Sequence, residues 1–579
     1  MCLAVDRLPK VETIRAEINK RYDELYHTTK DGERKPYVCV FCDEFIVSIA
    51  DKCTIGSKMM ENRRQLMSWT NFVDDRRKVE LEHYYQAPAD VIARFPFLSG
   101  MALSPRCNVV EESHTRSGRR LTRKVCSFIC CKRCKSNVER KFVPRHAILN
   151  SNYSGAAPPC LTVLTVVELA FLTPLKRYGF CISFSGGKQT NLKGTMTFMR
   201  MEKRAIVESV ATLDDMGLND NVLVLYSGRL TPWQKRRAEE LCQVRTDKLI
   251  EAAKWLCENN DKWRNVDYQE VIKNLEQKTP VVVDRSSEIE ATNGLGSNVE
   301  QEEIFTCFYP DGAMSPSNGG FDSPDGFKEY VTEMAQRGYK VEFQANIQQK
   351  YVRGDDPDLL VDSCLLQFPY GIGGMNDTRM LKDGSFSDRA DIEEYVEHMS
   401  RKSQLVFQKP MFQLVQYSLL SKYWLLKTSR LQLRGETDAS NLANGLLSGD
   451  VINSINGRRL KHRYAGTTNS RRFLDAVDAT AKALPHTNEA AKKARQQGEA
   501  MQHHFGMSSV FVTFTFDDEN SLVMQVLSGE DIDDDTPTEN LSDEQVLERA
   551  NRRRELRIEY PGIAALNFAK CNSRSYWKW

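Results

Sequence analysis

The segment Pro36–Phe45, which reads PYVCVFCDEF, decides the fold of the N-terminal part of the chain. Its cysteines, Cys39 and Cys42, are two residues apart, a spacing that favours a knuckle turn and places two sulfurs on the same side of it. A second C-x-x-C pair, Cys131 and Cys134, lies further along the chain. Because structural zinc binds four ligands tetrahedrally, the two pairs together predict one structural zinc site.

The choice of zinc ligands leaves two alternatives open. The separation between the two pairs is long for a zinc finger, so these cysteines can instead be separate buried thiols. Cys126 and Cys130 also lie beside the second pair. Spacing alone does not decide which of Cys126, Cys130 and Cys131 binds the metal together with Cys134.

The composition indicates a large soluble protein, because 579 residues exceed what one hydrophobic core usually supports and predict three or four domains. The longest apolar run, Pro158–Pro174, is interrupted by Glu168, so we expect no membrane partner. The first ten residues, MCLAVDRLPK, lack the apolar core of a signal peptide. The sixteen cysteines are therefore expected in a reducing compartment, where metal binding and burial outrank disulfides.

The net charge of +2 conceals two strongly charged regions. Residues 114–145 contain eleven Lys or Arg and one acid, whereas residues 529–544 contain eight acids and no base. Basic side chains on a rigid knuckle can contact phosphates, which predicts a nucleic-acid-binding surface; a solvated face or a localisation signal is the alternative. The predicted nucleic-acid-binding residues are Arg119, Arg120, Arg123, Lys124, Lys132 and Arg133.

The pattern along the chain predicts a multidomain α+β fold. We expect a cysteine-rich, zinc-knuckle-like basic module, an α+β unit, a linker with a loop, a largely helical region and a short tail. These parts are assigned to residues 1–155, 156–283, 284–325, 326–568 and 569–579. The composition of residues 284–303 and 529–544 predicts exposed, mobile segments, because it offers little apolar area to bury.

Local motifs within these parts predict individual elements. FCISFSGG (Phe180–Gly187) and GTMTFMR (Gly194–Arg200) are typical of a strand, a glycine-rich turn and a second strand. LLQFPYGIGG (Leu365–Gly374) is expected to form a loop. The alanine-rich stretch Asn488–His504 predicts a helix, and Ser509–Phe516 a strand.

Motifs for catalysis are absent from the sequence. There is no phosphate-binding Walker loop, no H-E-x-x-H and no H-x-H among the nine histidines. The adjacent His503 and His504 point in different directions on a helix, so we expect them to pack or cap its end and not to chelate one ion. We therefore predict that the chain is not an enzyme and has no small-molecule substrate.

Three segments together resemble proteins of the Helitron family of rolling-circle transposons. The first comprises the cysteine segment Pro36–Phe45, the stretch Cys131–Asn150 and the stretch Leu164–Gly194, and it resembles the cysteine-motif region of such proteins, with matching residues at Pro144, Ala147 and Asn150. The second is the loop LLQFPYGIGG with the stretch Ser403–Leu420, similar to the start of the Helitron helicase-like domain. The third, HHFGMSSVFVTFTFDDEN (His503–Asn520), resembles the first motif of the replication-initiator nuclease.

The resemblance implies a DNA-binding role without chemistry. In that family later strands supply two metal-binding histidines and a later helix supplies nucleophilic tyrosines, and neither motif follows Phe516. Residues 569–579 leave the family pattern, so Tyr576 is not assigned as a nucleophile.

We therefore expect a truncated Helitron-like transposase fragment with an incomplete initiator-nuclease domain. It would bind DNA weakly, preferably single-stranded, without nuclease or helicase activity, and reside in the nucleus if expressed and otherwise in the cytoplasm. The alternative is a host zinc-containing scaffold for protein interactions.

Overall fold

The computed structural model of the 579-residue chain describes more than half of its residues. These are 26–28, 32–48, 50–71, 78–115, 122–165, 168–169, 172–184, 190–200, 223–227, 245–263, 283–284, 303–309, 350–352, 356, 358–377, 379–380, 386–387, 391–434, 454, 467–468, 470–472, 474–475, 488–506, 522–530 and 541–573. They form a mixture of helices and small sheets, which confirms the predicted α+β class.

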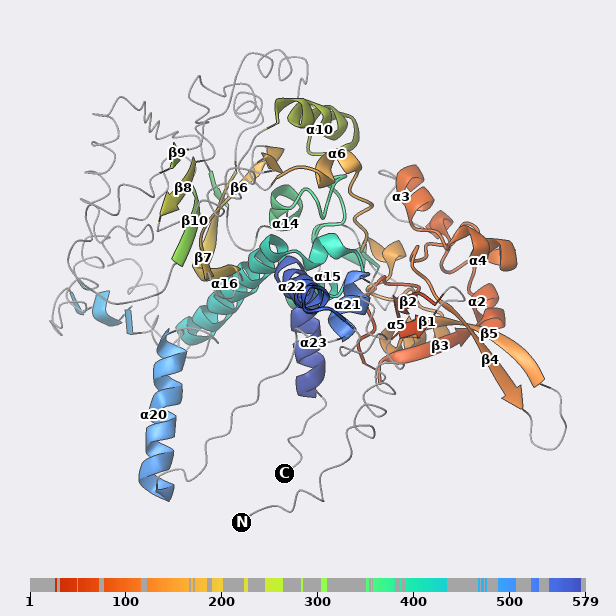
Figure 1. Ribbon diagram of the computed structural model, residues 1–579. Helices are drawn as coiled ribbons and strands as arrows, with labels where there is room; N and C mark the ends of the chain where they lie inside the picture. Colours follow the sequence, from red (N-terminus) through yellow and green to blue (C-terminus); the bar gives the residue numbers. More distant parts are fainter. Residues whose placement is uncertain are drawn as a thin grey trace. The chain divides into compact units, whose positions relative to one another are not determined.

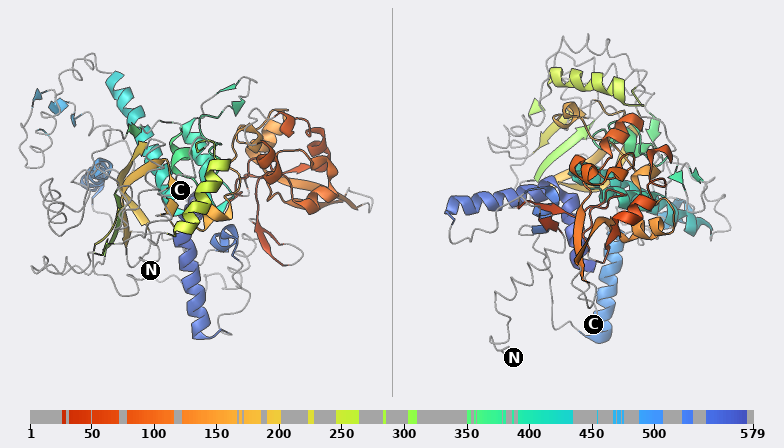
Figure 2. Two further views of the ribbon diagram at one scale, coloured as in Figure 1. Left: turned by 90° about the horizontal axis from the view of Figure 1, so that it is seen from above. Right: turned by 90° about the vertical axis from the view of Figure 1, so that its right-hand side faces the viewer.

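The N-terminal part is built on a three-stranded antiparallel sheet in the order β3-β5-β4 (Figure 1). Its strands are β3 (Lys52–Gly56), β4 (Val109–Thr115) and β5 (Thr122–Cys131). Around it lie β1 (Tyr26–Thr28), β2 (Arg34–Pro36), α2 (Ser57–Asn62), α3 (Lys78–Tyr84), α4 (Ala89–Arg94) and α5 (Lys132–Glu139). The β4–β5 ribbon extends beyond the helices at the lower right of Figure 1, and Figure 2 shows the same part from two further sides.

The core of this part covers both faces of the central strand β5. Phe128, Ile129 and Cys130 are successive residues on alternating faces, and all three are fully buried. Phe128 packs edge-on against Phe95, with ring centroids 5.4 Å apart. Phe41, which lies between Cys39 and Cys42, is buried in the same core, so the predicted cysteine turn belongs to the hydrophobic interior of this part.

A second sheet has six strands in the order β11-β7-β6-β10-β8-β9. Its strands are β6 (Leu175–Phe184), β7 (Thr190–Arg200), β8 (Leu223–Ser227), β9 (Val283–Asp284), β10 (Glu303–Tyr309) and β11 (Lys350–Val352). The antiparallel pair β6 and β7 confirms the two predicted strands, whereas residues 185–189 between them lie outside the described residues.

Strand β10 lies where the sequence predicted only linker and loop, at residues 284–325. Its sequence EIFTCFY is rich in aromatic and β-branched residues, which suit a strand, and it pairs with both β6 and β8. The low apolar content of residues 284–303 therefore does not extend into the stretch that follows, and part of the range assigned to linker and loop forms a strand. Residues 285–302 and 531–540, most of the two segments predicted to be mobile, lie outside the described residues.

The remaining described elements are mainly helices. They are α6 (Pro159–Thr162), α10 (Thr246–Asn259), α14 (Leu359–Ser363), α15 (Ile392–Ser400), α16 (Pro410–Arg434), α20 (Asn488–Phe505), α21 (Leu522–Ser528), α22 (Asp543–Glu559) and α23 (Pro561–Ser573), with the two-stranded pair β12 (Arg379–Met380) and β13 (Phe386–Ser387). Helix α20 confirms the alanine-rich prediction. The predicted strand Ser509–Phe516 lies outside the described residues.

The loop predicted at Leu365–Gly374 is confirmed, and two of its glycines have left-handed backbone conformations. Gly371 has φ of 71° and Gly373 has φ of 89°. A Cβ atom on Gly373 would lie 1.8 Å from the carbonyl oxygen of Tyr153. Only glycine therefore fits this turn, which brings the loop against the segment that follows α5.

The chain divides into two compact units, residues 1–415 with 516–579, and residues 416–515. All of the residues in the site described below belong to the first unit. Within the described part of the chain, no helix has the length and apolarity needed to cross a bilayer.

Candidate metal centre

Four cysteine thiols converge at the junction of β5 and α5. Their sulfur atoms all lie within 4.8 Å of one another, and Cys42 Sγ is 3.9 Å from Cys131 Sγ. A tetrahedral ion with sulfur ligands at 2.3 Å requires sulfur atoms about 3.8 Å apart. Cys39, Cys42, Cys131 and Cys134 are all buried, so together they could hold one metal ion.

The first pair is presented by a tight turn. Asp43 N donates to Cys39 O at 3.0 Å, Cys39 N donates to Glu44 O at 2.9 Å, and Asp43 has a left-handed φ of 58°. The turn is fastened to the sheet because Val40 N donates to Ile129 O at 3.1 Å. We call residues 39–45 the knuckle.

The second pair is presented by the start of a helix. Cys131 is the last residue of β5 and the N-cap of α5, and its sulfur accepts a hydrogen bond from Cys134 N at 3.4 Å. A helix N-terminus stabilises negative charge. The side-chain hydrogen bonds from Cys134, Cys39 and Cys42, together with this backbone N–H, hold the pKa of the Cys131 thiol well below its usual range.

The other thiols of the cluster behave in the opposite way. Burial and contacts with the neighbouring cysteines raise the pKa of Cys42, and the bond to Cys131 raises that of Cys134. The cluster without metal therefore favours one thiolate, at Cys131, that accepts hydrogen bonds from three thiols. Binding of a dication would convert all four groups to thiolates, because metal binding releases the thiol protons.

The structure identifies the second pair among the adjacent cysteines. Cys126 lies apart from the cluster, and its sulfur accepts a hydrogen bond from Arg94 Nη2 at 3.0 Å. Cys130 pairs with Cys53 across β3 and β5 and precedes Cys131 in the strand, so its side chain points to the opposite face. The cluster contains Cys131 and Cys134, as predicted, and its four thiols are not separate.

Of the predicted nucleic-acid-binding residues, Lys132 and Arg133 lie at this junction. Arg119 and Arg120 lie outside the described residues, and Arg123 and Lys124 belong to β5. The side chains of Lys132 and Arg133 are exposed in the first turn of α5. Arg133 Nη2 also donates to both oxygens of Glu44, at 3.0 and 2.8 Å, so this guanidinium already binds a carboxylate.

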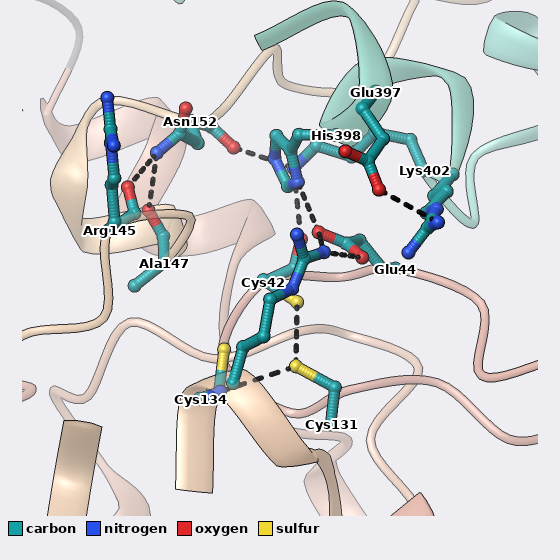
Figure 3. A network of polar contacts seen from close by, with 12 residues as sticks. Cys42, Glu44, Cys131, Cys134, Arg145, Ala147, Asn152, Glu397, His398 and Lys402 are labelled. Carbon is teal, nitrogen blue, oxygen red and sulfur yellow. Dashed lines mark hydrogen bonds and ion pairs between the residues drawn. The ribbon is translucent and has the colours of Figure 1, made fainter. Parts of the chain in front are cut away.

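A second cluster, not predicted from the sequence, consists of Glu44, His146 and His398. One ligand atom from each lies within 4.8 Å of the other two. His398 Nδ1 is 2.7 Å from Glu44 Oε1, and the two imidazole rings are stacked with centroids 5.1 Å apart. Figure 3 shows Glu44 and His398 beside Cys42, Cys131 and Cys134.

Burial sets the charge state of this second cluster. It raises the pKa of Glu44, which Arg133 partly offsets. It also lowers the pKa of His146 to about 3, with a further contribution from His398. His146 is therefore a neutral imidazole at physiological pH, the form in which histidine binds metals. The only sequence signal for this cluster is Glu44, an acid two residues after a C-x-x-C pair. His398 is 354 residues away from Glu44, so the sequence does not indicate that the two side chains meet.

Buried polar side chains tie the knuckle to the segment that follows α15. The fully buried Lys402 donates from Nζ to Asn152 O at 2.6 Å and to Cys42 O at 3.3 Å. Asp43 Oδ1 accepts hydrogen bonds from the hydroxyls of Ser104 and Ser403, at 2.5 and 2.7 Å. These bonds keep the backbone of the knuckle in a single position. His503 and His504, by contrast, are exposed on α20.

Comparison with protein families found one match, at residues 140–275, to a family described as a domain of unknown function, DUF6570. The matched region begins in the segment that carries His146 and ends beyond α10. No curated protein and no solved structure matched the chain.

Proposed function

We propose that this chain is a nucleic-acid-binding protein of the Helitron type, in which a structural zinc ion stiffens a basic surface. We further propose that it carries out neither strand cleavage nor helicase chemistry by itself. The observation that carries the proposal is the convergence of four buried thiols at the junction of β5 and α5, beside the exposed Lys132 and Arg133.

Zinc is the metal that suits this centre best. Four thiolates are soft ligands, and a closed tetrahedral set of four sulfurs is typical of structural zinc and of iron–sulfur sites. The separation of 3.9 Å between Cys42 Sγ and Cys131 Sγ is close to the value of about 3.8 Å for sulfurs on one zinc ion. The site is closed by protein on all sides, because all four cysteines are buried, which supports a structural role.

Nucleic acid is the partner that suits the charge distribution. Residues 114–145 contain eleven basic residues; Lys132, Arg133 and Lys135 belong to α5, which carries Cys134 of the proposed zinc site, and Arg123 and Lys124 belong to β5, which ends at Cys131. Lysine and arginine bind phosphates through charge and release of counterions, which gives affinity without sequence preference. The preference for single strands, and the Helitron assignment itself, rest on the sequence resemblance.

The absence of cleavage rests on the missing chemical groups. An initiator nuclease requires a metal to polarise the phosphate and a tyrosine to attack it. The sequence has no H-x-H motif to bind such a metal, and the paired His503 and His504 are exposed on α20. Tyr560 packs under Lys409, whose Nζ lies 4.5 Å from the ring centroid.

The binding test measures fluorescence anisotropy of a labelled oligothymidine as a function of salt concentration. The triple variant R119A/R120A/K132A should bind more weakly, and the slope of log affinity against log salt should fall by about 2, since each phosphate contact on a single strand contributes about 0.7. The matched control is K492A/K493A/R495A, which removes three exposed cations from α20 and should leave the slope unchanged.

Three results would contradict parts of the proposal. Equal losses in the two triple variants would show that binding reflects only total charge. No binding by the wild-type chain, with the metal content retained, would favour the protein-interaction scaffold. A covalent adduct with single-stranded DNA in the presence of Mn²⁺, lost in Tyr560→Phe, would refute the absence of nuclease activity.

A further inference from the structure

We propose that Glu44, His146 and His398 form a second metal site, which binds a divalent transition-metal ion through one carboxylate oxygen and two imidazole nitrogens. This site is distinct from the four-cysteine centre and does not depend on the nucleic-acid-binding role. The knuckle joins the two sites, because Cys39 and Cys42 supply sulfur ligands to one and Glu44 supplies a carboxylate to the other.

The spacing of the three ligand atoms suits a single ion. They lie within 4.8 Å of one another, and His398 Nδ1 is 2.7 Å from Glu44 Oε1. Ligands bound to zinc at about 2.1 Å in a tetrahedral arrangement are about 3.4 Å apart. To accept an ion, His398 Nδ1 and Glu44 Oε1 therefore need to move apart by less than about 1 Å, which side-chain rotation can provide.

Backbone hydrogen bonds hold the segments that carry the three ligands around the knuckle. Ile148 N donates to Phe41 O at 2.8 Å, which fixes the segment of His146. Phe45 N donates to Arg401 O at 2.8 Å, and this fixes the end of α15 that carries His398. The three ligands are brought together by the fold before any ion binds, so binding does not have to order the chain.

The surroundings of Glu44 resemble the outer shell of a metal site. Arg133 Nη2 donates to Oε2 at 2.8 Å and to Oε1 at 3.0 Å, and it fixes the carboxylate with Oε1 toward His398. Hydrogen bonds of this kind orient ligating carboxylates in known metal sites. The guanidinium charge opposes a nearby dication, so we expect weaker binding here than at the four thiolates.

Access and coordination number differ from those of the cysteine centre. Glu44 and His398 are buried, whereas His146 is partly exposed and gives the ion a route to solvent. Two histidines and one glutamate leave a fourth position for water, the arrangement found in open zinc sites. A proton shared between Glu44 and His398 would give the same geometry without metal, and the number of bound ions separates the two possibilities.

The experiment counts bound metal in the full-length chain. Protein dialysed against a weak chelator should keep one ion at the cysteines, and titration with Co²⁺ should then add a second equivalent. The second ion should show visible d–d absorption without thiolate-to-cobalt charge transfer, because its ligands are nitrogen and oxygen. In Glu44→Gln and His146→Asn the second equivalent should be lost while the first ion remains.

The control is His83→Asn, which replaces an exposed histidine and should keep both equivalents. His146 is partly exposed, so its variant is expected to fold, which circular dichroism would verify. Saturation of the wild-type chain at one equivalent, or a second equivalent that persists in both variants, would overturn the proposal. The cysteine centre is read separately from the zinc that the chain retains after dialysis, so failure at one site is not mistaken for failure at the other.

Discussion

Glu168, the acid that interrupts the longest apolar run of the sequence, forms a buried ion pair that should control the stability of α10. Its side chain is fully buried. Oε1 accepts hydrogen bonds from Arg245 N at 2.7 Å and Nε at 3.0 Å. Oε2 accepts hydrogen bonds from Arg245 Nη2 and Thr165 N, both at 2.7 Å. One carboxylate therefore joins the segment after α6 to the residue that precedes α10.

Replacing Glu168 with glutamine should lower the free energy of opening of α10 by about 2–3 kcal/mol. The amide keeps one acceptor but turns an NH₂ group toward two of the four donors, and a lost hydrogen bond to a charged group contributes about 1.5–3 kcal/mol. The partial exposure of Arg245, 36%, allows water to satisfy some of its donors, so we expect the loss of one such bond and not two.

The assay is amide hydrogen exchange of residues 246–259, followed by mass spectrometry. A loss of about 2–3 kcal/mol corresponds to exchange that is roughly 30 to 150 times faster. The matched control is Glu251→Gln on the same helix, whose partner Lys248 lies 3.2 Å away in an exposed ion pair. Glu251→Gln should lower the opening free energy of α10 by less than about 0.5 kcal/mol. Equal exchange rates in the two variants would refute the argument from burial.

The same ion pair predicts that the stability of α10 depends on pH. Burial alone would raise the pKa of Glu168, but the hydrogen bonds from Arg245 and Thr165 outweigh it and lower the pKa below the ordinary value. The unfolded chain therefore binds the proton more readily, and the stabilisation is complete above the ordinary pKa of glutamate. The opening free energy of α10 should fall as the pH is lowered below that value and through the depressed pKa of Glu168, and it should not do so in Glu168→Gln.

Three further predictions concern the knuckle and its neighbours. Cys131→Ser, or removal of metal by a strong chelator, should unfold the knuckle and α5, measured by amide exchange, because structural zinc contributes about 10 kcal/mol or more in small metal-bound domains; unchanged protection would contradict a structural zinc. Gly373→Ala should lower the free energy of unfolding by more than about 3 kcal/mol, since its Cβ would meet a carbonyl oxygen at 1.8 Å, whereas Gly506→Ala, with a similar φ and open space around it, should cost about 1 kcal/mol. Lys402→Met should lower the free energy of unfolding by about 2–4 kcal/mol, measured by urea denaturation, because two buried carbonyl oxygens lose their donor. A gain in stability would show that the cost of burying the ammonium charge exceeds the stabilisation from its hydrogen bonds.

The sequence alone determined those features that depend on residues close together in the chain. The C-x-x-C spacing predicted a knuckle because a turn of a few residues presents two sulfurs together. Alternating patterns predicted β6 and β7, and alanine-rich composition predicted α20. Gly371 and Gly373 marked the loop that Leu365–Gly374 forms. In each case the forces act within about one helical turn or one hairpin, so the local sequence carries the information.

Only the tertiary structure decided which distant residues meet. Because side chains alternate along a strand, Cys130 points away from the face on which Cys131 lies. The first turn of α5 places Cys134 beside Cys131, so the structure selects Cys131 as the partner of Cys134, which the spacing of the cysteines left open. Strand β10 joined the second sheet because β6 and β8 provide hydrogen-bonding partners on either side of it. Glu44 and His398 are 354 residues apart, and nothing in the sequence near either one indicates the other. Their contact exists because the backbone of the knuckle pairs with the segment after α15, and the order of the chain does not show which surfaces pack together.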